Sequence, residues 1–173
     1  MKTTIISTIF ILILAIITLL SVGIIRENKR RELFNSKLES IINAELYTLE
    51  SRAVRVSELY NQKKIVIIYF DTYCDICRIE AKEFFHLKAQ FKDSDIIFIS
   101  SNTTDEIKKF IVENKLSQSN IHFLNDKNYL LIKEYDISNI PFIILYINNR
   151  IHKTYKGAIN IKQIIKDKNE KEI

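Results

Sequence analysis

Cysteine, proline, glycine and tryptophan are scarce in this chain of 173 residues, which has two cysteines, one proline, two glycines and no tryptophan. So few glycines and prolines exclude a collagen-like or low-complexity protein. A fold held together by disulfides needs more cysteines at longer spacings, and closing the short loop between Cys74 and Cys77 would stabilise a fold little. The two cysteines therefore indicate chemistry rather than structural cross-linking.

Outside a short basic cluster at residues 26–31, charge of one sign is not concentrated either. The net charge is +5, but the basic residues are spread along the chain and form no aromatic-studded basic face, so nucleic acid is not indicated as a partner. The three histidines, His86, His122 and His152, do not stand at finger-like spacing from the cysteines. We therefore predict no metal site.

One long apolar run is present at the N-terminus. The stretch from Ile5 to Ile25 is uncharged and apolar on every face, and it has the length of about 20 residues that crosses a bilayer as a helix. Residues 1–25 are predicted to be a transmembrane anchor, or a cleaved signal segment because Ser21 and Gly23 form a small-x-small pattern. The basic cluster from Arg26 to Arg31 argues for a cytoplasmic domain, whereas the short Lys2-bearing start argues for export.

Residues 26–52 are predicted to form a juxtamembrane amphipathic helix. Apolar residues recur there in steps of three and four: Phe34, Leu38, Ile41, Ile42, Leu46 and Leu49. This stripe could pack on the following domain, lie at the bilayer surface or pair with a second copy of the chain. The domain itself is expected over residues 53–173, starting with an edge strand from Ala53 to Val56.

Strands and helices alternate along this domain. Buried strands are predicted at 65–70, 96–99 and 142–147, with a shorter one at 121–124. Helices follow the cysteines, begin after Thr103 in a capping box with Glu106, and occur near 128–135 and 161–165. Asn148 and Asn149 favour a hairpin turn into a strand over 150–155. The order predicts an α/β domain whose mixed sheet is flanked by helices on both faces.

Cys74 and Cys77 come directly after the first buried strand and open a helix. The free N–H groups and the dipole at a helix start favour an anion, so a thiol there ionises more readily, and the thiolate is the attacking species. Cys74, at the exposed end, is therefore predicted to be the nucleophile. Cys77 lies one turn further, faces inward and would resolve the mixed disulfide.

Two further residues accompany the cysteines. Extending the apolar stripe of the helix backwards from Phe84 places Glu80 on its buried side, where desolvation would raise the carboxyl pKa and allow it to exchange a proton with Cys77. The alternative is a glutamate that reaches solvent at the helix start. Pro141, after Ile140, begins a strong strand. The Ile140–Pro141 peptide bond could be cis and present a backbone edge there, or Pro141 could be an ordinary trans proline at the start of a strand.

These features occur in an order that resembles the thioredoxin superfamily, and most closely its membrane-anchored, extracytoplasmic TlpA-like branch. The resemblance covers roughly residues 53 to 168 and is carried by the strand Ile65–Phe70, Tyr73, Cys74-x-x-Cys77, Arg78, Glu80, Ile99-Ser100-Ser101, Leu124-Asn125-Asp126, Tyr135-x-Ile137, Ile140-Pro141, Asn148-Asn149 and Gly157.

The resemblance implies a thioredoxin fold, a nucleophilic Cys74, a resolving Cys77 and a cis Ile140–Pro141 bond against the disulfide. It also implies that Tyr73, Ile140 and Pro141 contact the substrate, and that no cofactor is needed beyond the Cys74–Cys77 disulfide.

The sequence departs from this family at three places. Ile68 replaces the buried aspartate of cytosolic thioredoxins, Tyr73 replaces the usual tryptophan, and Asp75-Ile76 separates the cysteines. An acidic residue beside Cys74 opposes a negative charge on its sulfur.

The predicted function is a thiol–disulfide oxidoreductase that reduces disulfides of exported proteins outside the cytoplasm, with electrons from a membrane donor. An oxidant or isomerase with the same site is the first alternative, and a non-catalytic thioredoxin-like binding module with a locked disulfide is the second. No distinct peroxidatic motif is found.

Overall fold

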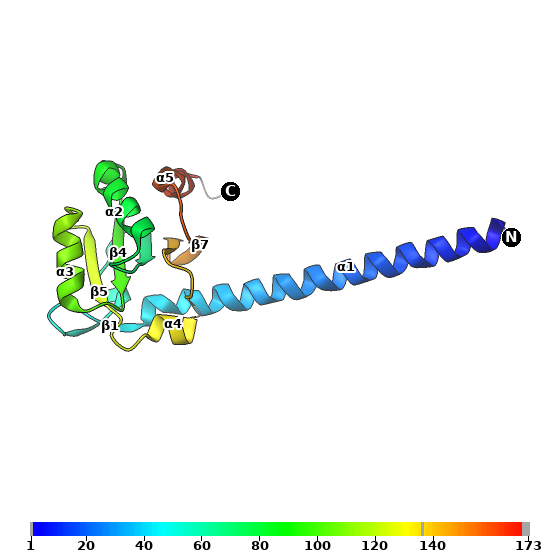
Figure 1. Ribbon diagram of the computed structural model, residues 1–173, viewed down its shortest axis with the longest axis horizontal. Helices are drawn as coiled ribbons and strands as arrows, with labels where there is room; N and C mark the ends of the chain where they lie inside the picture. Colours follow the sequence, from blue (N-terminus) through cyan, green and yellow to red (C-terminus); the bar gives the residue numbers. More distant parts are fainter. Residues whose placement is uncertain (1, 136, 171–173) are drawn as a thin grey trace. The chain divides into compact units, whose positions relative to one another are not determined.

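The computed structural model describes residues 2–135 and 137–170, with side chains from residue 13 onward except at 136. The chain divides into two compact units, of which the first ends at Lys37 and the second begins at Leu38. The two units are described separately, and Figure 1 identifies their elements.

The first unit belongs to helix α1 (Lys2–Glu39). From Ile13 to Ile25 its large apolar side chains are exposed, Leu19 by 74%. Within the part of the chain that has described side chains, no helix is both long and apolar enough to cross a membrane. The anchor expected over residues 1–25 lies partly on residues 1–12, outside that part, so it stays a prediction.

The second unit contains one mixed sheet. The strands described are β1 (Glu45–Tyr47), β2 (Ala53–Arg55), β3 (Lys64–Tyr69), β4 (Ser94–Ser100), β5 (Ile121–Asn125), β6 (Phe142–Ile147) and β7 (Arg150–Lys156). Their spatial order is β2-β1-β5-β4-β3-β6-β7. Strands β3, β4 and β5 are parallel, whereas β6 and β7 are antiparallel to their neighbours. This confirms the predicted mixed sheet, in which helical crossovers join β3, β4 and β5 and the β6–β7 hairpin closes one side.

Four helices and three short 3-10 turns accompany these strands. They are α2 (Asp75–Leu87), α3 (Thr104–Glu113), α4 (Leu130–Tyr135), α5 (Ile161–Asn169), η1 (Ser40–Asn43), η2 (Val56–Glu58) and η3 (Lys88–Phe91), counting only described residues. The β6–β7 turn forms as expected, because Asn148 and Asn149 both adopt positive φ, at 53° and 63°.

The helix predicted over residues 26–52 is wrong beyond Glu39. A 3-10 turn follows, and then β1 and β2 form a hairpin in which Leu46 pairs with Val54. Strand β1 also pairs with β5, through Tyr47 and Asn125, so it belongs to the sheet of the domain expected to start only at residue 53. Ile41 and Leu46 are buried in the observed turn and strand, and a helix with this apolar spacing would place them on its buried side too. The spacing therefore does not distinguish a helix from a turn followed by a strand.

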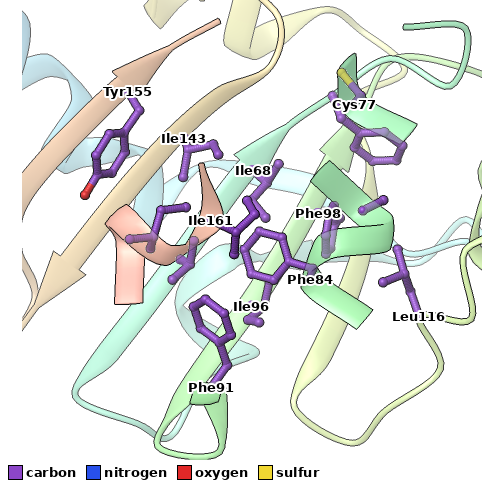
Figure 2. Packing of buried hydrophobic residues seen from close by; sticks show 14 of the residues in the cluster. Ile68, Cys77, Phe84, Phe91, Ile96, Phe98, Leu116, Ile143, Tyr155 and Ile161 are labelled. Carbon is purple, nitrogen blue, oxygen red and sulfur yellow. The ribbon is translucent and has the colours of Figure 1, made fainter. Parts of the chain in front are cut away.

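The main core lies between one face of the sheet and helices α2, α3 and α5. It is built from alternate strand residues such as Val66 and Ile68, together with aromatic rings from the helices and from β4. Phe98 is the central ring, since it stacks on Phe123 at 5.1 Å and lies edge-on to Phe84 at 5.9 Å. Figure 2 shows part of this core, including Ile68, Phe84 and Phe98, with Cys77 at one end of the cluster.

The opposite face of the sheet is covered by shorter segments. Tyr146 is fully buried on this face, and its hydroxyl donates to the Leu38 carbonyl at 2.6 Å. Near α4, the Asp126 carboxylate accepts the N–H groups of Leu130 and Leu131 at 2.7 and 2.9 Å. Both faces of the sheet are therefore covered, as predicted, although the longer helices of this domain pack on one of them.

The two edges of the sheet are short or charged. Strand β2 has three residues, with Ala53 and Arg55 exposed. Strand β7 exposes Arg150, His152 and Lys153, and its pairing with β6 is interrupted by an irregularity at Leu145 and Tyr146.

The N-terminus of α3 is closed by the predicted capping box. Thr103 Oγ1 accepts from the Glu106 N–H at 3.4 Å, and Glu106 Oε2 accepts from the Thr103 N–H at 2.8 Å. We expect Thr103→Ala to lower the free energy of unfolding by about 1 kcal/mol in urea denaturation, because the side-chain partner of one orphan N–H is lost. Thr104→Ala removes the same hydroxyl one position further along. An equal loss in that control would contradict a capping origin.

Candidate active site

The loop between β3 and α2 places Cys74 at the cap position of the helix. Its backbone is extended, at φ −76° and ψ 116°, and the helix begins at the next residue. The Cys77 N–H donates to Cys74 Sγ at 3.1 Å. A sulfur in this position lies at the positive end of the helix and accepts one of its free N–H groups. Cys77 is buried, as predicted, whereas Cys74, which was expected at the exposed end, is half-buried; both are free thiols.

Cys77 lies one turn deeper and is 4% exposed. Burial raises the pKa of its thiol above the ordinary value, and the interaction with Cys74 adds to this effect. Cys77 therefore holds its proton at neutral pH unless a nearby base removes it.

Glu80 provides a carboxylate on the same buried side of α2. Its side chain is 5% exposed, and Oε1 accepts the Ile159 N–H at 2.8 Å. Burial raises the carboxyl pKa to about 7, although the Ile159 N–H favours the charged form and opposes the shift. The structure thus confirms the buried placement and the direction of the pKa shift. Near neutral pH this group is present in both protonation states, as a proton carrier must be.

Pro141 lies at the same end of the sheet as the two cysteines. The Ile140–Pro141 peptide bond is cis, and β6, which begins at the next residue, pairs with β3 so that Phe142 stands opposite Tyr69. Pro141, Cys77 and Glu80 line a common cavity of about 10 Å³. A cavity of this size admits no more than one water-sized group, so a substrate would meet this region from its outer surface.

The backbone just before Cys74 is fixed by side chains outside the motif. Asn102 Oδ1 accepts the Thr72 N–H at 2.9 Å, and Arg78 Nε donates to the Thr72 carbonyl at 3.0 Å. Asn102 is in turn fixed by Ser100, whose hydroxyl donates to the same Oδ1 at 2.6 Å. No sequence motif indicates this role of Asn102, and the one signal in the sequence is the polar run that follows the buried strand β4.

Tyr73 is tied to a different element. Its ring is 67% exposed beside Cys74, and its hydroxyl donates to Glu106 Oε1 on α3. Ile76, which is 40% exposed, lies between the cysteines and adds a second apolar side chain to this surface. The sequence predicted Tyr73 as a substrate contact and Glu106 as a helix cap, but gave no sign that the two side chains meet.

The site has the groups needed for exchange of electrons between sulfurs. An exposed-side thiol, a buried thiol in the next turn, and a carboxyl group that titrates near neutrality lie together at one end of the sheet. Among the described residues, no group of three or more histidine, cysteine, aspartate or glutamate side chains is placed to hold a metal ion.

Comparison with known proteins agrees with this architecture. The AhpC/TSA family matches residues 39–168. No curated protein sequence gives a significant match. Among solved structures, a secreted disulfide oxidoreductase of Mycobacterium tuberculosis described as homologous to E. coli DsbE is 16% identical, with a TM-score of 0.63, over 74% of this chain and 96% of that one.

Two other solved structures are also similar. StoA from Bacillus subtilis is 22% identical, with a TM-score of 0.57, over 75% of this chain and 99% of that one. Peroxiredoxin 6 of Arenicola marina is 10% identical, with a TM-score of 0.62, over 71% of this chain and 67% of that one. At such identities the likeness shows the fold, which is thioredoxin-like. Since the family match extends over most of the chain and includes both cysteines and Pro141, the chain belongs to the AhpC/TSA family.

Proposed function

We propose that this chain is a thiol–disulfide oxidoreductase that reduces disulfides in exported proteins. Cys74 Sγ attacks one sulfur of a client disulfide, so that a mixed disulfide forms and the other client sulfur leaves as a thiolate. Cys77 Sγ then attacks Cys74 Sγ, and the second client sulfur leaves. The client gains two electrons and two protons overall, and the protein is left with a Cys74–Cys77 disulfide.

One observation carries this proposal: the Cys77 N–H donates to Cys74 Sγ at the start of α2, while the Cys77 thiol itself is buried. The first sulfur is therefore the less buried of the two and lies at the start of the helix, and the second is protected until the mixed disulfide has formed. This asymmetry supports Cys74 as the nucleophile and Cys77 as the resolving thiol.

Glu80 is proposed as the base that takes the proton of Cys77 during resolution. The two residues line the same small cavity, and the Glu80 pKa of about 7 leaves much of its carboxyl ionised at neutral pH. Because the Ile159 N–H fixes Oε1, the carboxylate is held in place within the buried side of α2. The interpretation of Glu80 as a surface glutamate does not agree with its burial.

The client is proposed to dock on the outer surface beside Cys74. Tyr73 offers an exposed ring, and the backbone of Ile140, just before β6, is proposed as the pairing edge, since Pro141 has no N–H and its carbonyl already accepts the Gly157 N–H at 2.8 Å. An extended chain could pair with such an edge while its side chains contact the aromatic ring.

We further propose a reducing direction, membrane attachment through the N-terminal segment, an extracytoplasmic domain and a membrane electron donor, as in the TlpA-like branch. The exposed apolar side chains from Ile13 to Ile25 support attachment, because soluble surfaces rarely carry so long an apolar stretch. The reducing direction is supported by the burial of Cys77 and by the acidic Asp75. A dithiol protein is a strong oxidant when its reduced, ionised form is stabilised, and neither burial nor a neighbouring negative charge stabilises a thiolate.

The test is insulin reduction and redox titration of the full-length protein, kept in detergent. With dithiothreitol as electron source, the protein should accelerate insulin reduction, and its reduction potential should lie below about −200 mV, nearer to thioredoxin than to DsbA. A potential near −120 mV would instead indicate the oxidant. No acceleration over a Cys74→Ser/Cys77→Ser control would favour the non-catalytic binding module.

A further inference from the structure

The contact between Tyr73 and Glu106 is not explained by the capping of α3 alone. Glu106 uses its two carboxylate oxygens for different partners: Oε2 accepts the Thr103 N–H at 2.8 Å and the Thr103 hydroxyl at 2.7 Å, whereas Oε1 accepts the Tyr73 hydroxyl. The first set of bonds is the capping box. The second joins α3 to the residue immediately before the nucleophile.

The loop bearing Tyr73 is already fixed without this contact. Asp71 Oδ1 accepts the Tyr73 N–H at 2.7 Å, and Asn102 and Arg78 hold the backbone of Thr72 on both sides. The hydroxyl bond therefore adds little to the backbone position of Cys74. What it does determine is the orientation of an otherwise exposed aromatic ring.

A ring that is 67% exposed would otherwise sample several rotamers, and a client would have to order it on docking. The bond to the carboxylate removes that freedom in advance. The hydrogen bonds from Tyr73 and Thr103 lower the pKa of the Glu106 carboxyl, so the acceptor stays charged well below neutral pH.

We propose that Glu106 is a positioning residue that holds the Tyr73 ring beside Cys74, so that the client chain binds against an aromatic ring that is already correctly oriented. This inference deepens the proposed function and rests on it. It predicts an effect on client affinity and none on the sulfur chemistry, because Glu106 reaches the site only through the Tyr73 hydroxyl.

The test compares Tyr73→Phe, Glu106→Gln and the double variant with the wild type in full-length, pre-reduced protein. Each pre-reduced protein is mixed with insulin at a series of concentrations, and the rate of its single-turnover oxidation is measured. The reaction is stopped with acid, the remaining thiols are alkylated, and the oxidised fraction is determined from the protein mass. Tyr73→Phe keeps the ring and loses the bond. Glu106→Gln leaves one carbonyl oxygen to serve both Tyr73 and Thr103. Each variant should raise the half-saturating insulin concentration about three- to fivefold with an unchanged limiting rate, and the double variant should be no worse than Tyr73→Phe.

Two controls separate this role from others. Thr103→Ala weakens the helix cap but leaves Oε1 for Tyr73, so its half-saturating concentration should stay that of the wild type. The rate of Cys74 alkylation by iodoacetamide should also be unchanged in each of the variants. Slower alkylation in Tyr73→Phe or Glu106→Gln, additive effects in the double variant, or an unchanged insulin dependence would each overturn the inference. A wild-type protein that fails to react with insulin would instead reject the proposed function, and the inference with it.

Discussion

The Cys77→Ser protein should accumulate as covalent mixed disulfides with its clients, and the Cys74→Ser protein should not. Cys74 keeps its place at the helix cap and its N–H donor when residue 77 is serine, because that donor is a backbone group. It can attack a client, but no second sulfur releases the product. In Cys74→Ser the remaining thiol is buried and 4% exposed, so it reaches no client sulfur.

The same pair of variants gives a quantitative result. Disulfide reduction by Cys74→Ser should fall by at least about 10³-fold, since a serine hydroxyl supplies no thiolate. Trapping is measured in cells on non-reducing gels, with the captured partners identified by mass spectrometry and with Cys74→Ser/Cys77→Ser as the control. Equal trapping by the two single variants would contradict the assignment of Cys74 as the nucleophile and Cys77 as the resolving thiol.

Replacing Glu80 with glutamine should make the protein more stable at pH 8 by about 3 kcal/mol, while leaving it nearly unchanged at pH 4. The folded-state pKa of about 7 lies above the ordinary value of 4.5, so the folded protein binds the proton more tightly than the unfolded chain. The stabilisation from this group is complete below pH 4.5 and is lost as the pH rises through 7. At 1.36 kcal/mol per pKa unit, this gives the expected magnitude.

Glutamine is the appropriate replacement because its carbonyl oxygen can still accept the Ile159 N–H that Glu80 accepts at 2.8 Å. The free energy of unfolding is measured in urea at pH 4, 6 and 8, under reducing conditions. The matched control is Glu113→Gln, which removes an exposed carboxylate from α3. If wild type and Glu80→Gln lose stability in parallel between pH 4 and 8, the carboxylate is not effectively desolvated.

Much of the domain could be predicted because its local patterns agree with its tertiary structure. The buried strands β3, β4 and β6 were recognisable as continuous β-branched and aromatic runs, and the capping box placed the start of α3. The buried side of α2 followed from extending its apolar stripe backwards to Glu80. In each case the residue pattern and the packing lead to the same result.

The parts that were missed depend on contacts between distant segments. The sequence predicts helix at strand β1 because Leu46 continues a three- and four-residue spacing, whereas the conformation of this segment is decided by pairing with β2 and β5. Hydrogen bonds join Asn102 to Thr72 and Glu106 to Tyr73, and each pair is separated by about 30 positions in the sequence. These bonds cross loops whose geometry no local pattern determines. The sequence patterns thus identify the candidate reacting groups but not the side chains that hold their loop.

The borders of the sheet limit how this protein can meet other chains. A strand from another molecule could extend the sheet only at β2, which is three residues long, or at β7, where Arg150, His152 and Lys153 face outward. Short or positively charged borders discourage such growth into fibres, particularly between copies with the same charge. At high concentration or on prolonged storage, self-association through backbone pairing should therefore be slow.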